Sequence, residues 1–155
     1  MNEQYAELII SFPLFDAFTV HGARRLLDAG TVKEHAAGAI LLKEGDHSDF
    51  VVLVLTGKLE VYVEREGRAL VLTETNPGTI LGELAMLCGI PRSASVRAKE
   101  DSVVLEWSDE AFRTLLLRDQ TLSQEIFGKA LLTLVEKEKS LIDSLIKSQH
   151  AGSKG

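Results

Sequence analysis

Glycine residues divide the middle of the chain into short runs, and this feature restricts the fold more than any other. They are Gly38, Gly45, Gly57, Gly67, Gly78, Gly82 and Gly89. Residues 50–55 form a continuous apolar run, which indicates a strand buried on both faces, whereas residues 59–64 alternate in polarity, which indicates a half-buried strand. A hairpin turn is predicted at 65–68, and further strands are predicted at 69–75, 96–98 and 103–107. Many short strands with regular turn signals are typical of a sandwich or a barrel.

Helical patterns lie on both sides of this region. Residues 3–10 and 17–28 are predicted to be helical. Ser108 followed by two acidic residues predicts the start of another helix. Helix is predicted to continue from there, with a break near Asp119, to about Gln149. An apolar stripe with four-three spacing marks this last segment: Phe127, Leu131, Leu134, Leu141 and Leu145. The expected fold is therefore mainly β with flanking helices: an eight-stranded antiparallel β-barrel of jelly-roll type, preceded by N-terminal helices and followed by a long C-terminal helix.

The length of 155 residues favours one domain with a substantial core. We expect a single domain over residues 1–150. Its parts are N-terminal helices at 1–30, the barrel at 31–107 and C-terminal helices at 108–149. The last residues, 151–155, are small and polar, and they predict a disordered tail.

The net charge of −6 argues against a protein that binds nucleic acid through a basic face. A local anion site is compatible with that charge, because one arginine and a few backbone amides are enough to make one. The single cysteine, Cys88, excludes an internal disulfide and indicates a reducing, cytoplasmic compartment. We expect it to be a small buried apolar residue rather than a redox sensor. No apolar run is long enough for membrane insertion, and the N-terminus lacks the basic start of a signal peptide.

The segment around Gly82 carries the most specific chemistry in the sequence. Gly82 permits a tight turn, and residues 83–87 predict one short helix, whose free N-terminal amides favour an anion and which Gly89 can close. Arg92, at the start of the following strand, suits a phosphate because its planar guanidinium donates two parallel hydrogen bonds. The Glu83 carboxylate nearby can accept hydrogen bonds from sugar hydroxyls. Phosphate and ribose together indicate a nucleotide ligand.

Residues 78–98 resemble the phosphate-binding cassette of the cyclic nucleotide-binding domain family, which includes the catabolite activator protein, the regulatory subunits of cAMP-dependent protein kinase and cyclic-nucleotide-gated channels. The family pattern is glycine-glutamate-leucine-alanine, a short gap, then glycine-x-proline-arginine, followed by serine, threonine or alanine, and alanine. Residues 82–85 and 89–94 match this pattern. The similarity covers about residues 8–148 and includes Glu44-Gly45-Asp46, Asp49 and Gly57, so it is far more specific than a lone glycine motif.

The resemblance implies a set of ligand-binding residues. For the phosphate these are Arg92, Ser93 and Ala94, and for the ribose they are Gly82, Glu83, Leu84 and Ala85. Arg92 would pair with the cyclic phosphate, and Glu83 would accept from the ribose 2′-hydroxyl. Ser93 stands where the family selects the base, and since serine there is ambiguous, cAMP is the favoured ligand and cGMP the alternative. The base-capping residue comes from the last helix and is left open around residues 134–142.

The implied function is a regulatory domain that binds a cyclic nucleotide and relays binding through its C-terminal helix, which folds over the base as a lid. The alternative is a domain of the same fold that has lost its ligand and serves as a dimerising or structural module. Helix 120–148 outruns the barrel, so it predicts a homodimer contact, although an apolar stripe of this kind more often serves core packing. The effector protein that receives the signal is not identified by the sequence.

Other classes of function have less support. No nucleophile–base pair stands out and the four histidines are scattered, so we expect no enzyme, no metal and no cofactor beyond the nucleotide ligand. A transcription factor of the catabolite activator type needs a helix-turn-helix after the long helix, for which the sequence up to Gly155 leaves no room. We therefore expect no direct contact with nucleic acid.

Overall fold

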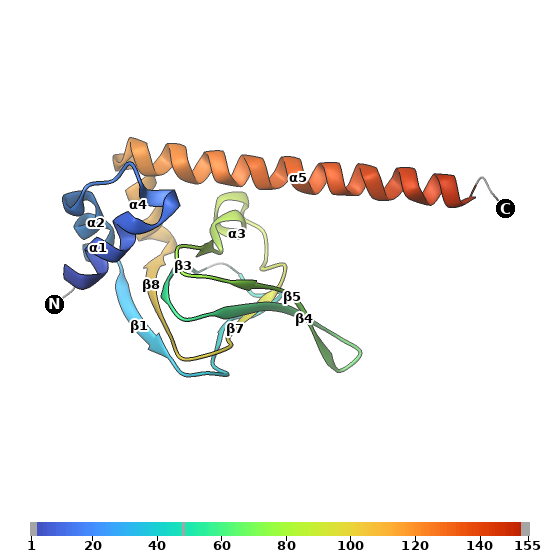
Figure 1. Cartoon of the computed structure of the whole chain (residues 1–155), viewed down its shortest axis with the longest axis horizontal. Coiled ribbons are helices and arrows are strands. Elements are labelled where there is room, and N and C mark those ends of the chain that lie inside the picture. Colours follow the sequence, from blue (N-terminus) through green and yellow to red (C-terminus); the bar gives the residue numbers. More distant parts are fainter. Residues whose placement is uncertain (1–2, 48, 153–155) are drawn as a thin grey trace.

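The computed structural model describes residues 3–47 and 49–152; at 84, 87, 126–127, 129–134, 137 and 149–152 it describes the backbone alone. Its centre is a β-sandwich of two four-stranded antiparallel sheets, with helices at one end and along one side (Figure 1). One sheet has the order β1 (Thr31–His35), β8 (Ser102–Ser108), β3 (Phe50–Thr56), β6 (Ile80–Leu81). The other has the order β2 (Ile40–Leu42), β7 (Ser95–Ala98), β4 (Leu59–Arg65), β5 (Arg68–Thr75).

The strands do not close into the predicted barrel. Eight antiparallel strands are present, as expected, but within the described residues their ladders form two separate sheets. The edge strands explain the difference. β2 and β6 have only three and two residues, which is too short to bridge one sheet to the other, and β5 leaves seven of its eight residues exposed. The prediction of a mainly β fold with flanking helices is confirmed, and the closed barrel was wrong.

The strand β3 divides the interior into two cores. Its side chains are buried from Val51 to Leu55, as the continuous apolar run predicts. Alternate residues face opposite sides: Val51, Leu53 and Leu55 pack under the helices, and Val52 and Val54 pack between the sheets. The predicted hairpin turn is also confirmed, because Glu66 and Gly67 have φ of 55° and 75°, the left-handed pair of a two-residue type I′ turn.

Helices cover one end of the sandwich and continue past it. They are α1 (Glu3–Ser11), the 3-10 turn η1 (Pro13–Phe15), α2 (Val20–Asp28), α3 (Glu83–Cys88), α4 (Asp109–Arg118) and α5 (Gln120–Gly152). α2 starts three residues later than predicted, because the Thr19 hydroxyl caps it by accepting from the Gly22 amide at 3.1 Å. The fully buried Trp107 of β8 donates from Nε1 to the Leu26 carbonyl at 2.8 Å, which fastens α2 to the sheet.

The predicted break near Asp119 is confirmed. Asp119 has an extended backbone, with φ −114° and ψ 102°, and it is the one residue between α4 and α5. Its carboxylate accepts from the Leu122 amide at 3.0 Å, which caps α5, and from Arg25 of α2 at 3.3 Å. Ser108 caps α4, as predicted, by accepting from the Ala111 amide at 3.0 Å. The junction of the two helices is thus tied to the N-terminal helices.

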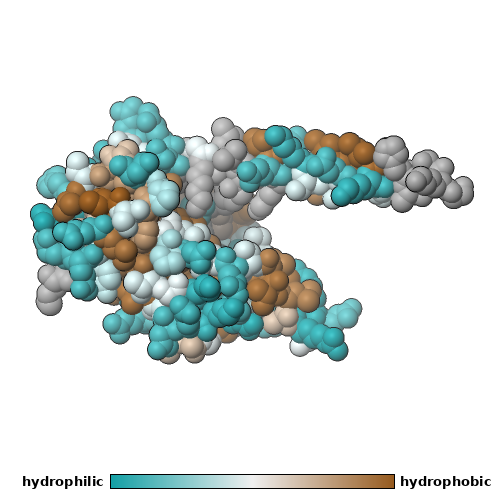
Figure 2. Space-filling view, viewed as in Figure 1, coloured by the Kyte–Doolittle hydropathy of each residue, from teal (hydrophilic) through white to brown (hydrophobic). Residues whose placement is uncertain are grey.

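α5 packs against α4 and η1 and then projects past the sandwich (Figure 1). Every described side chain of α5 beyond residue 134 is exposed. Five of them are large and apolar, with 40–66% of their surface accessible: Val135, Leu141, Ile142, Leu145 and Ile146. Figure 2 shows apolar surface on this projecting part.

The predicted apolar stripe therefore does not serve the core at its far end, because Leu141 and Leu145 are exposed. The other members, Phe127, Leu131 and Leu134, lie outside the described side chains. α5 continues to Gly152, three residues past its predicted end, and residues 153–155 of the predicted tail lie outside the described residues. None of the described helices is long and apolar enough to cross a membrane.

Candidate functional site

α3 is a six-residue helix between two glycines that both adopt the left-handed conformation. Gly82, with φ 92°, precedes the helix, and Gly89, with φ 65°, ends it. The amides of Gly89 and Ile90 both donate to the Ala85 carbonyl, which closes the C-terminal end as the sequence predicts. The first amides of the helix, at the opposite end, have no helical acceptor.

Two observations favour glycine at position 82, beside Arg92. A Cβ at this position would lie 2.1 Å from Arg92 Nη1. The φ of 92° also disfavours any side chain there. The sequence predicts a tight turn at Gly82, and the structure adds that the turn lets the guanidinium approach the backbone.

Arg92 is a buried cation with a free donor. Only 6% of the residue is exposed. Its Nη2 donates to the Phe50 carbonyl at 2.6 Å, and its guanidinium carbon lies 5.3 Å from the centroid of the Phe50 ring. Its Nη1 is buried without a hydrogen-bond partner among the described residues. Because a buried, unpaired donor is costly, this nitrogen indicates a site for an anionic acceptor.

Acidic residues surround this cation. Burial lowers the pKa of Arg92, and the charges of four carboxylates act in the opposite direction: Asp109, Asp49, Asp46 and Glu83. They come from the loop between β2 and β3, from α3 and from the start of α4. Taken by themselves, the negative charges of these carboxylates favour the charged form of the guanidinium.

The turn at Glu44-Gly45-Asp46 holds the backbone of Arg92. The Arg92 amide donates to the Asp46 carbonyl at 2.8 Å, and the Gly45 amide donates to the Arg92 carbonyl at 2.8 Å. The φ of 87° at Gly45 explains the glycine. The Glu44 carboxylate accepts two hydrogen bonds from Arg65, each 2.9 Å long, and these lower the pKa of Glu44. This motif, which lies outside the cassette, therefore positions the cassette's arginine.

Most of the predicted residues line one cavity of about 200 Å³. Its more polar side consists of Gly82, Glu83, Arg92, Ser93 and Ala94, and its apolar side of Leu42, Val61, Ile80, Leu81, Ala85 and Val96. Glu83 is buried, with 9% of its surface exposed, whereas Ser93 is exposed. The cavity thus joins a cation and a carboxylate to an apolar wall, an arrangement that suits an anion linked to a sugar and a ring.

The structure brings together six of the seven predicted ligand-binding residues. The side chain of the seventh, Leu84, lies outside those described. Sequence reasoning missed the Phe50 carbonyl and the apolar wall from β2, β4 and β7. The alternation of β4 is the signal that could have placed Val61 on an inward face.

One expectation about α3 is wrong, because Cys88 is exposed rather than buried. Met86 takes the inward face of this helix and is 1% exposed. Two residues further along a helix the side chain has turned by about 200°, so Cys88 points away from the core.

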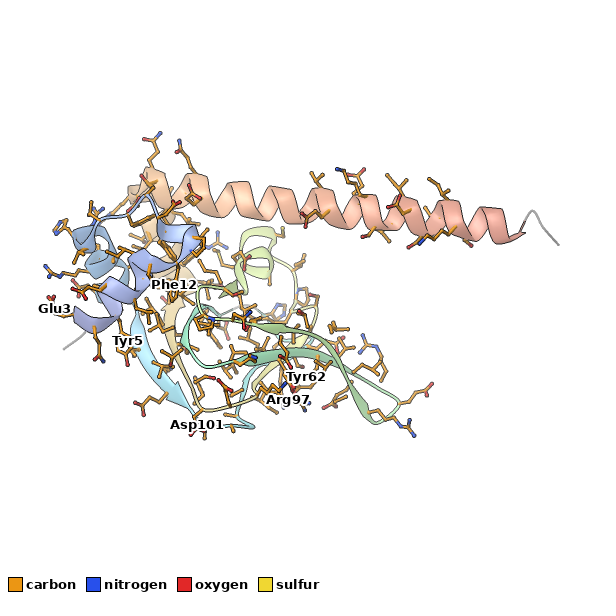
Figure 3. The ribbon with its side chains drawn as sticks, in the orientation of Figure 1. Glu3, Tyr5, Phe12, Tyr62, Arg97 and Asp101 are labelled. Atoms are coloured by element: carbon orange, nitrogen blue, oxygen red, sulfur yellow. The ribbon has the colours of Figure 1, made fainter. Side chains whose placement is uncertain are left out.

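Arg97 of β7 provides a contrast with Arg92. Its Nε donates to Glu60 at 3.0 Å, and its guanidinium carbon lies 4.4 Å from the centroid of the Tyr62 ring. Figure 3 shows Arg97 and Tyr62 close together in the sandwich. Arg97 has partners of its own and does not line the cavity, so Arg92 is the arginine that suits a ligand.

A larger hollow, of about 620 Å³, lies between α2 and α4. Its charged lining residues are Arg25, Asp28, Glu110, Arg118 and Asp119, and it contains none of the predicted ligand-binding residues. The smaller cavity is the candidate ligand site, because the buried donor without a partner lies there. In the part of the chain that the structure describes, no cluster of three or more His, Cys, Asp or Glu could hold a metal ion.

The fold and the site define a β-sandwich domain with a cavity that contains a buried arginine and a buried glutamate. The protein-family model for the cyclic nucleotide-binding domain matches residues 32–119 of this sequence. The chain therefore belongs to this family. It is 33% identical over 121 residues to a cAMP-dependent protein kinase regulatory subunit from Blastocladiella emersonii, a match that covers 77% of this chain and 29% of the relative. The chain spans about three tenths of the length of the curated relatives it matches. In two of them the match covers 29% and 31% of the relative's sequence.

Solved structures agree with this assignment. The chain is similar to the catabolite activator protein of Thermus thermophilus, with a TM-score of 0.73 and 26% identity over 87% of this chain and 63% of that one. It is also similar to the regulatory domain of Toxoplasma gondii PKA crystallised with cAMP, with a TM-score of 0.63 and 26% identity over 73% and 43% of the two chains. The family resemblance drawn from residues 78–98 is therefore confirmed.

Proposed function

We propose that the chain is a regulatory domain that binds a cyclic nucleotide, cAMP in preference to cGMP. The observation that carries the proposal is the unpartnered Nη1 of the buried Arg92, in a cavity that Glu83 also lines. A cyclic phosphate supplies the acceptor that this nitrogen lacks, and a ribose hydroxyl supplies a donor for the carboxylate.

Each part of the ligand has a place in this proposal. Arg92 donates to the phosphate through Nη1 while Nη2 stays on the Phe50 carbonyl, and Ser93 and Ala94 complete the phosphate site. Glu83 accepts from the 2′-hydroxyl, and the backbone of Gly82, Leu84 and Ala85 lines the ribose. In this proposal the base lies against the apolar wall formed by β2, β4 and β7.

The preference for cAMP is supported by the relatives rather than by a contact in the pocket. The relatives are named as regulatory subunits of cAMP-dependent protein kinase, and the Toxoplasma gondii domain was crystallised with cAMP. Ser93, at the edge of the cavity, has a hydroxyl that can contact either purine, so cGMP is the ligand to compare.

Binding is relayed through α5 in this proposal. α5 starts one residue after α4, and its far part has no packing to lose when it moves, because its described side chains beyond residue 134 are exposed. A ligand that favours one position of α4 therefore shifts the junction at Asp119, and α5 folds over the base as a lid. Within the capping range 134–142, the described apolar side chains are Val135, Leu141 and Ile142.

Calorimetric titration of the purified protein with cAMP, and then with cGMP, tests the proposal. We expect tighter binding of cAMP. Arg92→Ala should weaken binding by about 2–5 kcal/mol, because a desolvated charge pair loses one partner. Arg97→Ala is the matched control, since this arginine does not line the cavity, and it should leave the affinity unchanged. Unchanged affinity in Arg92→Ala would overturn its role, and no heat with either nucleotide would overturn the proposed function.

A second candidate function is favoured by the exposed apolar side chains of α5. They suit a homodimer contact through helix 120–148, with or without a ligand. Sedimentation velocity with and without cAMP distinguishes the two functions. A dimer that is indifferent to any nucleotide would favour a dimerising module, and Leu145→Glu should then dissociate it.

We further infer a regulator rather than an enzyme, which acts in the cytoplasm through another protein. The relatives' names describe regulatory subunits of a protein kinase. The net charge of −6 supports an effector that is a protein rather than a nucleic acid.

A further inference from the structure

The C-terminal end of α3 is held by an arginine from another helix. Arg113 of α4 donates from Nη2 to the Met86 carbonyl at 3.0 Å. A helix leaves its last four carbonyls without helical donors. After α3, the next two amides, those of Gly89 and Ile90, both donate to the Ala85 carbonyl. The Met86 carbonyl therefore takes its donor from outside the helix.

This bond spans a gap between the two helices. α3 and the first turn of α4 border a cavity of about 110 Å³. It is lined by His47, Ala85, Met86, Gly89, Ile90, Asp109 and Arg113. His47, Gly89, Ile90 and Arg113 are exposed, so this gap opens to solvent and side-chain packing does not fill it. The Arg113 hydrogen bond joins the two sides.

α4 is a firm base for that bond. Phe112, the residue before Arg113, is fully buried and packs against Trp107, with ring centroids 5.4 Å apart. At the start of the same helix, the Asp109 amide donates to the Asp49 carbonyl at 3.0 Å. The Asp109 carboxylate is also one of the charges that act on Arg92. One helix thus contacts both the cassette helix and the surroundings of the phosphate-binding arginine.

We propose that Arg113 is a positioning residue for the ligand pocket. By holding the Met86 carbonyl, it fixes one end of α3 so that Gly82 and Glu83, at the other end, stay beside Arg92. It also ties any movement of α3 to α4, and through α4 to the junction at Asp119. The effect on ligand affinity rests on the proposed function, whereas the effect on α3 in the free protein does not.

Arg113→Ala should weaken cyclic-nucleotide binding about five- to tenfold, because the ligand must then order a helix that the protein no longer holds. Arg113→Lys keeps a cationic donor and should recover most of the affinity. Arg118→Ala is the matched control, since Arg118 is an exposed arginine at the end of the same helix, and it should stay within about twofold of the unsubstituted protein.

A spectroscopic probe on α3 separates positioning from a general loss of stability. Cys88 is the last residue of α3, is exposed, and is the one cysteine of the chain, so a trifluoromethyl label reports on this helix alone. In the ligand-free protein, Arg113→Ala should shift or broaden the fluorine signal, and Arg113→Lys should reverse that change. Arg118→Ala should leave the signal as it is.

The outcomes are distinguishable. If Arg92→Ala abolishes binding while Arg113→Ala changes neither the affinity nor the Cys88 signal, the positioning role is wrong and the proposed function stands. If the unsubstituted protein binds neither nucleotide, the proposed function fails. The fluorine comparison in the free protein then decides by itself whether Arg113 holds α3.

Discussion

α3 and α5 are helices held in opposite ways. α3 has six residues between two left-handed glycines, and other elements contact both of its ends, through Arg92 beside Gly82 and Arg113 on Met86. α5 has 33 residues and packs against α4 and η1. Beyond residue 134, every side chain of α5 that the structure describes is exposed. The comparison teaches that the candidate site lies beside a helix that is contacted at both ends, whereas the far part of α5 has only exposed side chains wherever they are described.

Matched substitutions in the two helices should differ most in stability. Met86→Ala removes a side chain that is almost wholly buried, and should cost about 2–5 kcal/mol of the free energy of unfolding. Leu141→Ala removes an exposed side chain, and should stay within about 0.5 kcal/mol. Denaturant unfolding at low protein concentration measures both. Similar losses of unfolding free energy in the two variants would show that the far part of α5 is packed in solution, and that α3 and α5 do not differ in this respect.

Gly82→Ala tests whether the constraint on α3 serves the ligand. The new Cβ displaces Arg92 Nη1, and we expect a loss in cyclic-nucleotide affinity of about 2 kcal/mol, or about thirtyfold. Gly38→Ala is the matched control, because Gly38 also has a positive φ, of 89°, but a Cβ there meets nothing within 4 Å. It should strain the backbone and leave the affinity, measured by calorimetry, unchanged. An equal effect of both substitutions would assign the loss to strain alone.

The attachment of α5 at Asp119 should be weaker than either of these contacts. Asp119→Ala removes the cap of α5, and should cost about 1 kcal/mol. Asp119→Asn keeps an oxygen for the cap but loses the charge that faces the exposed Arg25, and should cost less than about 0.5 kcal/mol. Thermal unfolding of the two variants separates the cap from the ion pair. Equal costs for the two variants would show that the ion pair dominates, because both lose it.

The smallest expected effect is a pH dependence in the turn that holds Arg92. The hydrogen bonds from Arg65 lower the pKa of Glu44 in the folded protein from its ordinary value of 4.5. The carboxylate therefore adds stability above that value, and this contribution is lost as the pH falls below it. Unfolding of the wild type and of Glu44→Gln should differ at pH 7 and converge in acid. In an Arg65→Ala background the difference should vanish at every pH.

The parts of the molecule that the sequence predicts correctly depend on neighbouring residues. Gly82, Gly89 and the cap at Ser108 act within one turn of chain, and the apolar run of β3 needs only to be buried. Closure of the sheets was predicted wrongly, since it depends on whether short strands such as β2 and β6 can bridge two sheets. The contacts of Phe50 and Arg113 escaped prediction because they lie 42 and 27 residues from their partners.

A single extended residue, Asp119, joins the ten residues of α4 to the 33 residues of α5. At a rise of 1.5 Å per residue, α5 is about 50 Å long. A rotation of about 10° at Asp119 therefore sweeps the far end of the helix through about 9 Å. Under the proposed relay, a rotation at this junction that is too small to alter the sandwich would give the far end of α5 a displacement comparable to the diameter of a helix. This displacement scales with the length of α5, so each helical turn removed from α5 would reduce it in proportion.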